Sequence, residues 1–397
     1  MTGIEYIKGI VEKLSRIPNR GATSSGEKEA ARIVQNELES FGYPISLETF
    51  PANKKLGWCM TYYFGLMFFG LLTGLCCPFI GLLIAIVAFW LFYTHMLFKD
   101  ALWRHLPPVG TSINVIGSKI LQNARQTVIL TAHIDAGQAA WFFNPKIKRF
   151  FAKHYKDKKS VKSPMYIPMW IFLLSITLLL AKTLGAHGAF INWWHYISLA
   201  LFAVAAVSVI QMIKSPQAPG ATDNATGVGA MLEIAKTLAE NPLQNSNLII
   251  VGTGSEETGL SGMRDFIKRH RAQIEALPAY FINFESIGGG RLCAVGDEGS
   301  IVRFHMPPFL NGLAKLVSRR QGFGDLKVIS LLAETDSCIP AIYGYDAMCF
   351  IALDELGIPL HYHETADLPD AVDYDLTKKA ADLGLAICLE LDGLSAN

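Results

Sequence analysis

The stretch TVILTAHIDAG, residues 127–137, carries the strongest indication of the fold. Residues 127–131 are apolar or β-branched and predict a buried strand. That strand leads directly into His133 and Asp135, so two polar side chains follow its carboxyl end. Ligand sites of open α/β sheets lie outside the carboxyl ends of the strands. The stretch therefore predicts an α/β fold with a functional site at the end of this strand.

Strands and helices alternate on both sides of this stretch. The apolar patterns predict further strands at residues 45–50, 112–116, 248–253, 280–284 and 348–353. The periodic patterns predict helices at residues 1–20, 24–41, 223–240, 262–273, 309–319 and 377–391. Such alternation is typical of a central sheet, mixed but mainly parallel, that is sandwiched between helices.

The charged residues are unevenly distributed. The chain has 397 residues, of which 17% are charged, against about 25% in an average soluble domain. Residues 56–98, 163–181 and 183–213 contain no Asp, Glu, Lys or Arg. A membrane-spanning helix needs about 20 apolar residues, so the first stretch holds two spans, with a break at Cys77-Pro78. Each of the other two holds one. We expect four transmembrane helices in two hairpins, because buried core helices are usually shorter and amphipathic.

A basic segment precedes the second hairpin. Residues 146–162 read KIKRFFAKHYKDKKSVK. A solvated loop would explain this composition, but beside a membrane span we expect an arm that touches anionic lipid. The net charge of +1 gives no overall bias toward nucleic acid. The seven cysteines are scattered without a CxxC pair, which indicates neither a disulfide framework nor a structural zinc site.

Histidines and carboxylates recur in short polar motifs between the apolar patterns. These candidate metal ligands are His133, Asp223 in GATDNATGVGA (220–230), Glu257 in GSEETG (254–259), Glu285 in NFESIG (283–288) and His363 in HYHETAD (361–367). His, Asp and Glu without Cys are typical of a catalytic zinc site, which usually takes three protein ligands. Five ligands fit two zinc ions that share one carboxylate. His361 is an alternative to His363.

In combination these motifs resemble the co-catalytic di-zinc aminopeptidases, a family (metallopeptidase family twenty-eight) that also includes glutamate carboxypeptidase and glutaminyl cyclase. The resemblance covers about residues 1–50, 111–137 and 217–397. It rests on HID (133–135), ATDNATGVGAMLE (221–233), SEETG (255–259), FESIG (284–288) and YHETADLPDAVD (362–373). It implies two zinc ions per chain and a peptide substrate.

The resemblance also implies a role for each residue. Asp223 would bridge the two ions, His133 and Glu285 would complete one site, and Glu257 and His363 the other. Glu256 would be the general base, and Asp135 would hydrogen-bond the far nitrogen of His133 and fix its tautomer. The HxxxD spacing from His363 to Asp367 favours His363 over His361, and Asp336 in ETDSCIP has a supporting role. Many aminopeptidases of the family have Asp where Glu285 stands, which leaves amino- or carboxypeptidase action open.

The chain is thus expected to divide into three parts of one peptidase domain and two insertions. The domain takes residues 1–55, 99–137 and 214–397, the hairpins take residues 56–98 and 163–213, and the basic arm takes residues 138–162. The expected function is a membrane-bound di-zinc aminopeptidase that acts on short or hydrophobic peptides at the membrane surface. The alternatives are a carboxypeptidase, an acyl transferase of glutaminyl-cyclase type and a non-catalytic relative that acts as a scaffold. No motif indicates the peptide preference or the oligomeric state.

The flanking charges predict the orientation in the membrane. Lys54, Lys55, Lys99 and Arg104 flank the first hairpin on the domain side, and residues 146–162 and Lys214 flank the second. The opposite turns carry only Lys182. Because positive flanks remain in the cytoplasm, we expect both termini and the domain there. The second insertion leaves the domain shortly after Asp135 and returns to it shortly before Asp223. The site is therefore expected to face the membrane surface, partly roofed by the basic arm.

Overall fold

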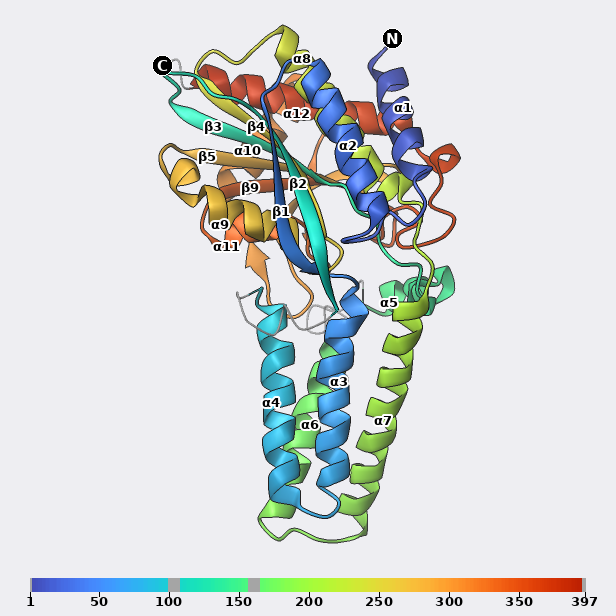
Figure 1. The fold of residues 1–397 in the computed structure, drawn as a ribbon. Coiled ribbons are helices and arrows are strands. Elements are labelled where there is room, and N and C mark those ends of the chain that lie inside the picture. The colour runs from blue at the N-terminus through green and yellow to red at the C-terminus, as the bar shows by residue number, and fades with distance from the viewer. Residues whose placement is uncertain (1, 99–107, 156–164, 395–397) are drawn as a thin grey trace.

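A computed structural model describes residues 2–98, 108–155 and 165–394. The described residues form an α/β domain that stands on one end of a bundle of four long helices (Figure 1). Two expected features fall partly outside these residues, namely the flanking charges Lys99 and Arg104 and the last part of the basic arm, from residue 156. The first part of the arm contains a helix, α5 (Pro145–Tyr155).

The domain is built on a nine-stranded mixed sheet. Its order is β1-β2-β4-β3-β5-β9-β6-β7, with β8 paired to β6. The strands are β1 (Ile45–Asn53), β2 (Val109–Lys119), β3 (Gln126–His133), β4 (Ser246–Thr253), β5 (Ala279–Glu285), β6 (Arg291–Glu298), β7 (Phe304–His305), β8 (Lys327–Leu331) and β9 (Asp346–Leu353). The central strands β4, β3, β5 and β9 are parallel to one another. The expected α/β sheet is confirmed, and its parallel centre brings several strand ends to one edge.

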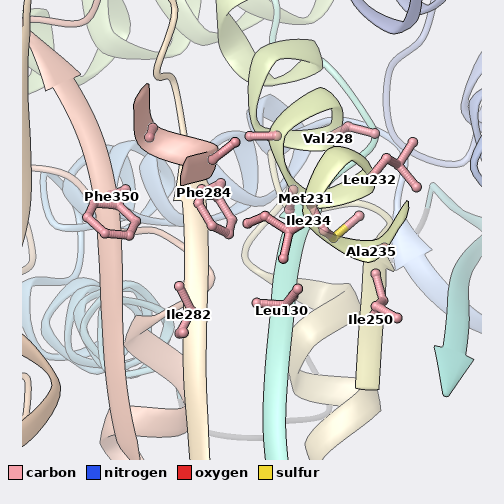
Figure 2. Close-up of a cluster of buried hydrophobic side chains, with 14 of the residues drawn as sticks. Leu130, Val228, Met231, Leu232, Ile234, Ala235, Ile250, Ile282, Phe284 and Phe350 are labelled. Atoms are coloured by element: carbon pink, nitrogen blue, oxygen red, sulfur yellow. The ribbon is translucent and has the colours of Figure 1, made fainter. Parts of the chain in front are cut away.

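Helices cover both faces of the sheet. They are α1 (Gly3–Ser15), α2 (Ser25–Ser40), α8 (Gly227–Glu240), α9 (Ser261–Glu275), α10 (Pro308–Arg320), α11 (Cys338–Ile342) and α12 (Tyr374–Leu394). Side chains alternate across a strand, so β3 presents Leu130 to the cluster that includes α8 and Ile129 to the cluster that includes α9. Figure 2 shows α8 packed over the strands that carry Leu130, Ile282 and Phe284. Burying each such side chain contributes about 1.5–3 kcal/mol.

The bundle is mainly apolar both inside and outside. Its helices are α3 (Leu56–Thr73), α4 (Pro78–Met96), α6 (Tyr166–Thr183) and α7 (Ala189–Lys214), and each is long and apolar enough to cross a membrane. In its interior Phe92 stacks against Phe172, and Phe202 meets Phe172 edge-on. Large apolar side chains also face outward, and Phe190 and Trp193 are 81% and 69% exposed. A helix that is apolar all round is typical of a core or of a membrane span.

Several contacts fix the bundle to the domain. Ile301, in the turn between β6 and β7, packs into the apolar cluster of the bundle. The Tyr166 hydroxyl at the start of α6 donates to the Ile301 carbonyl oxygen at 3.0 Å. On the other side, the Trp141 backbone N–H donates to Oε1 of Gln211 in α7 at 3.2 Å. The end of the bundle that carries the domain is therefore held against both β6–β7 and the segment after β3.

Candidate metal centre

The parallel strands bring the expected ligands to one edge of the sheet. His133 and Glu285 are the last residues of β3 and β5. Glu256 and Glu257 follow the end of β4 within a few residues. In the register of the sheet His133 lies opposite Thr253, the last residue of β4. The strands thus bring together side chains that are distant in the sequence. They do so beyond the strand ends, where open α/β sheets have their ligand sites.

Asp223 lies between two histidines. Its Oδ1 is 3.2 Å from Nε2 of His133, and its Oδ2 is 3.4 Å from Nε2 of His363. Each histidine also faces one glutamate. His133 Nε2 is 3.4 Å from Oε1 of Glu285, and His363 Nε2 is 3.0 Å from Oε2 of Glu257. The five side chains form two groups of ligands that share one carboxylate.

The geometry separates the two candidate histidines. His363 is 8% exposed, and its Nε2 points to Asp223 and Glu257. His361 instead contacts Oε2 of Glu364 through its Nδ1 at 3.2 Å, within the same loop. Only His363 of this pair joins the cluster of carboxylates.

Asp135 contacts more than its expected partner. The Nδ1 atom of His133 lies 3.2 Å from the Asp135 carbonyl oxygen and 3.5 Å from Oδ1 of the carboxylate. The same carboxylate accepts hydrogen bonds from the backbone N–H groups of Glu256 and Glu257, at 3.0 and 3.2 Å. Asp135 therefore orients His133 mainly through its backbone and fixes the loop that carries the two glutamates.

The expected helix start at Asp223 is wrong by four residues. Helix α8 begins at Gly227, and Asp223 lies in the preceding turn with φ −112° and ψ 88°, outside the helical region. The Asp367 carboxylate holds this turn by accepting from the N–H groups of Thr222 and Asp223, at 2.8 and 3.1 Å. Local apolar periodicity did not reveal this, because the partner lies far along the chain.

Three polar residues of the site were missed by the sequence analysis. Arg20 is 1% exposed and its Nη2 donates to the Gly220 carbonyl oxygen at 2.6 Å, next to the Asp223 turn. Asn224 donates to the Phe284 carbonyl oxygen at 2.8 Å and so ties that turn to β5. Glu27 resembles the third residue of a capped helix in sequence, yet its Oε1 accepts from the N–H of Ser255 at 2.7 Å. Nothing in the local sequence signals that these side chains turn inward.

Strained backbone surrounds the site. Ser255, Ser286 and His363 have φ values of 51°, 47° and 53°. Such left-handed conformations are uncommon for residues other than glycine and tend to cluster at functional sites. Each of these residues is, or directly adjoins, a candidate ligand or the candidate base. The backbone at Gly137 also lies close to the site, since a Cβ there would collide with His363 and Glu257.

The negative charges of the cluster favour the binding of cations. Burial raises the pKa of Glu256, Glu257 and Glu285. The charges of Glu285 and Glu257 raise the pKa of Glu256 further, and the charge of Asp223 does the same for Glu257 and Glu285. Burial lowers the pKa of His363, but the negative charges of Glu257 and Asp223 outweigh it and raise that pKa to about 10. Oδ2 of Asp223 is buried without a hydrogen-bond partner among the described residues. Divalent cations would neutralise these carboxylates and displace the histidine proton.

The donor atoms suit zinc. One atom each of His133, Asp223 and Glu257 lie within 4.8 Å of one another. Imidazole nitrogens with carboxylate oxygens, and no thiolate, are the ligand set of catalytic zinc sites. The residues present therefore fit the metal that the sequence motifs imply.

Comparison with protein families supports this interpretation. Residues 206–388 match the model of peptidase family M28. The matched region contains four of the five candidate ligands and Glu256, whereas His133 and Asp135 precede it. None of the curated proteins matches the chain significantly in sequence.

Solved structures share the fold. An aminopeptidase from Aneurinibacillus sp. strain AM-1 aligns with a TM-score of 0.58 at 14% identity, over 98% of this chain and 93% of its own. A Bacillus subtilis zinc aminopeptidase aligns with a TM-score of 0.56 at 14% identity, over 98% and 95%. A glutaminyl cyclase from Bacteroides thetaiotaomicron aligns with a TM-score of 0.57 at 14% identity, over 97% of both chains. At these identities the likeness concerns the fold.

Proposed function

Because the chain belongs to peptidase family M28, by the match of residues 206–388 and by its fold, we propose that it is a membrane-bound di-zinc exopeptidase. Within this class we propose an aminopeptidase, which removes N-terminal residues from short or hydrophobic peptides at the membrane surface. The observation that carries the proposal is the position of Asp223. Its two carboxylate oxygens face two histidines, and each histidine faces its own glutamate.

Two zinc ions would be held by this arrangement. His133 and Glu285 would hold one ion, Glu257 and His363 the other, and Asp223 both. When bound, such ions polarise a scissile carbonyl and increase the acidity of water. The remaining chemistry falls to the protein side chains.

Glu256 is the general base in this proposal. Its side chain is buried beside the cluster, and its charge interacts with those of His133 and Glu285. Its carboxylate takes a proton from the attacking water and later delivers it to the nitrogen of the leaving amine. Asp135 positions this base, because its carboxylate accepts the Glu256 backbone N–H. The Glu256 carboxylate thus carries the proton in both steps, and Asp135 fixes the backbone of Glu256.

The two alternatives fit less well. A glutaminyl-cyclase-type acyl transferase needs one zinc ion, whereas this chain brings five ligands together. A non-catalytic scaffold would have no use for a complete ligand set or for Glu256 beside it. Hydrolysis is therefore the function that the residues favour.

The experiment that tests this function is a digest of a free peptide and of its N-acetylated form. The protein, purified in detergent, is expected to shorten the free peptide from its N-terminus and to leave the acetylated one intact. A zinc chelator should abolish the reaction, because the ions supply the electrophilic part of the chemistry. Mass spectrometry of the products follows the cleavage. Shortening from the C-terminus would reassign the protein as a carboxypeptidase, and no cleavage of either peptide would reject hydrolysis.

The bilayer is the proposed environment of the bundle. Its four apolar helices support this, since large side chains such as Phe190 and Trp193 would otherwise face water. From the basic flanks we propose that both termini and the domain face the cytoplasm. The opposite end, with the exposed Cys76 in the turn between α3 and α4, would then lie outside.

Cysteine labelling tests this orientation. An impermeant maleimide added to intact cells should label Cys76 in the wild type. In a variant with Cys76→Ser, Cys77→Ser and the added Glu29→Cys, labelling should require that the cells be opened, because Glu29 is exposed on the domain. Gel shifts after labelling report the result. Labelling of the Glu29→Cys variant in intact cells would reverse the proposed orientation.

A further inference from the structure

Helix α5 has a basic and aromatic face that turns away from the domain. Lys146, Arg149, Phe150 and Lys153 are all exposed, and Phe150 is 57% exposed. Their spacing of three, four and seven residues from Lys146 puts them on one side of the helix. The helix contains no acidic residue. A surface of this composition suits the interface of an anionic bilayer, where the aromatic ring enters the headgroup layer and the cations meet phosphate.

The position of α5 agrees with that environment. It lies beside the domain-side end of α7 (Figure 1). The three-residue helix before it, Trp141–Phe143, is bonded to Gln211, one turn from the end of α7. If the bundle crosses a bilayer, α5 lies at the level of the headgroups. Trp141, which is 48% exposed, belongs to the same interfacial surface.

The opposite face of α5 is bonded to the loop that carries His363. Lys148 Nζ forms an ion pair with Oε1 of Glu364 at 2.7 Å, and the two side chains are only 11% and 15% exposed. Lys148 also donates to the Tyr362 carbonyl oxygen. One lysine therefore holds the residues on both sides of His363. Removing one partner of a largely buried ion pair is strongly destabilising, because the other charge is left without compensation.

An aromatic contact forms a second connection. The Phe143 ring meets the His363 ring edge-on, with centroids 4.3 Å apart. The Tyr362 ring stacks against His363 at 4.1 Å. The candidate zinc ligand is thus packed between its neighbour in the loop and a residue of the insertion. A displacement of α5 would therefore change the position of His363 through these contacts.

We propose that α5 binds anionic lipid headgroups and, through Lys148 and Phe143, holds the His363 loop in position for the metal centre. The inference rests on the proposed membrane location of the bundle, but it does not require that the site hydrolyse peptides. Lys148 is a positioning residue in this account, since it acts through Glu364 and Tyr362. The exposed cations of α5 bind the lipid.

Hydrogen exchange in lipid nanodiscs tests the proposal without relying on hydrolysis. The full-length protein is placed in phosphatidylcholine discs or in discs with roughly one third phosphatidylglycerol. In the wild type, anionic lipid should slow amide exchange in both α5 and residues 359–368, on the order of tenfold, because several cations contribute to the attraction. Slowing in α5 alone would refute the coupling, and no slowing in either segment would refute lipid binding.

Two sets of variants separate binding from coupling. Lys146→Gln, Arg149→Gln and Lys153→Gln together should abolish the lipid effect in both segments. The matched control, with Lys8, Lys28 and Lys327 changed to Gln elsewhere on the domain surface, should retain it. Lys148→Met should retain the effect in α5 and weaken it in residues 359–368, where the Phe143 contact remains, and Glu364→Gln should do the same.

Three further outcomes would contradict the proposal. An unchanged effect in the triple α5 variant would assign lipid binding to another surface. An unchanged effect on residues 359–368 in Lys148→Met and Glu364→Gln would show that the loop does not depend on this pair. If free inorganic phosphate gave the same protection in phosphatidylcholine discs, α5 would be a site for soluble anions. If no peptide is cleaved but the lipid effect is present, only the proposed peptidase function fails.

Discussion

Replacing Glu256 with glutamine is expected to lower peptide hydrolysis by about 10²–10⁴-fold, the usual contribution of general base catalysis. The zinc content should stay at the wild-type value, because the five ligands are other residues. Glutamine has nearly the same size as glutamate but cannot accept the proton of the attacking water. The backbone N–H of residue 256 would still donate to Asp135, so the loop should keep its position.

The measurement compares kcat and zinc content of the purified variant with those of the wild type. Glu29→Gln is the matched control, since Glu29 is exposed on α2 and lies outside the cluster. It should leave both quantities unchanged. Near-normal kcat in Glu256→Gln would show that another group takes the proton, and loss of zinc from this variant would make Glu256 a ligand.

Replacing Asp223 with alanine is expected to remove both zinc ions and all measurable hydrolysis. Its two oxygens are the one feature shared by the two groups of ligands, at 3.2 Å from His133 and 3.4 Å from His363. Without the carboxylate each group keeps only one histidine and one glutamate, one ligand fewer than the three protein ligands usual at a catalytic zinc. Elemental analysis of the dialysed protein gives the zinc content.

Asp325→Ala is the control for this change, because Asp325 is an exposed carboxylate that pairs with Arg319 on the surface. It should keep the wild-type zinc content and activity. If Asp223→Ala retained one zinc ion, Asp223 would belong to one group only and the bridge would be rejected.

The general fold was predictable because its signals are local. Buried strands such as residues 127–131 and 248–253 are short apolar runs between turns, and the four helices of the bundle come from long stretches that are almost free of charge. Strands β6, β7 and β8 were not predicted, and β7 has only two residues. β8 has only five residues, and β6 contains Gly296 and ends in the acidic pair Asp297 and Glu298, which obscures the strand pattern.

The residues that surround the candidate ligands were less predictable than the ligands themselves. Three of the five candidate ligands, His133, Glu257 and Glu285, lie at or just after strand ends, and the motifs around all five indicated their chemistry. Arg20 and Glu27 occur in a stretch that is typical of a solvated turn and helix start, yet they are buried against the Asp223 turn and Ser255. The contact of Lys148 with Glu364 joins residues more than two hundred positions apart. Only the folded chain brings them together.

The zinc content of the wild-type protein, measured beside Asp223→Ala in the same purification, is the decisive measurement for the two-metal site. We expect two zinc ions per chain in the wild type and none in the variant. Hydrolysis should be lost when the wild type is stripped by a chelator and should return when zinc is added back. One zinc ion per chain in the fully active wild type, or an active protein without zinc, would contradict the two-metal site built around Asp223.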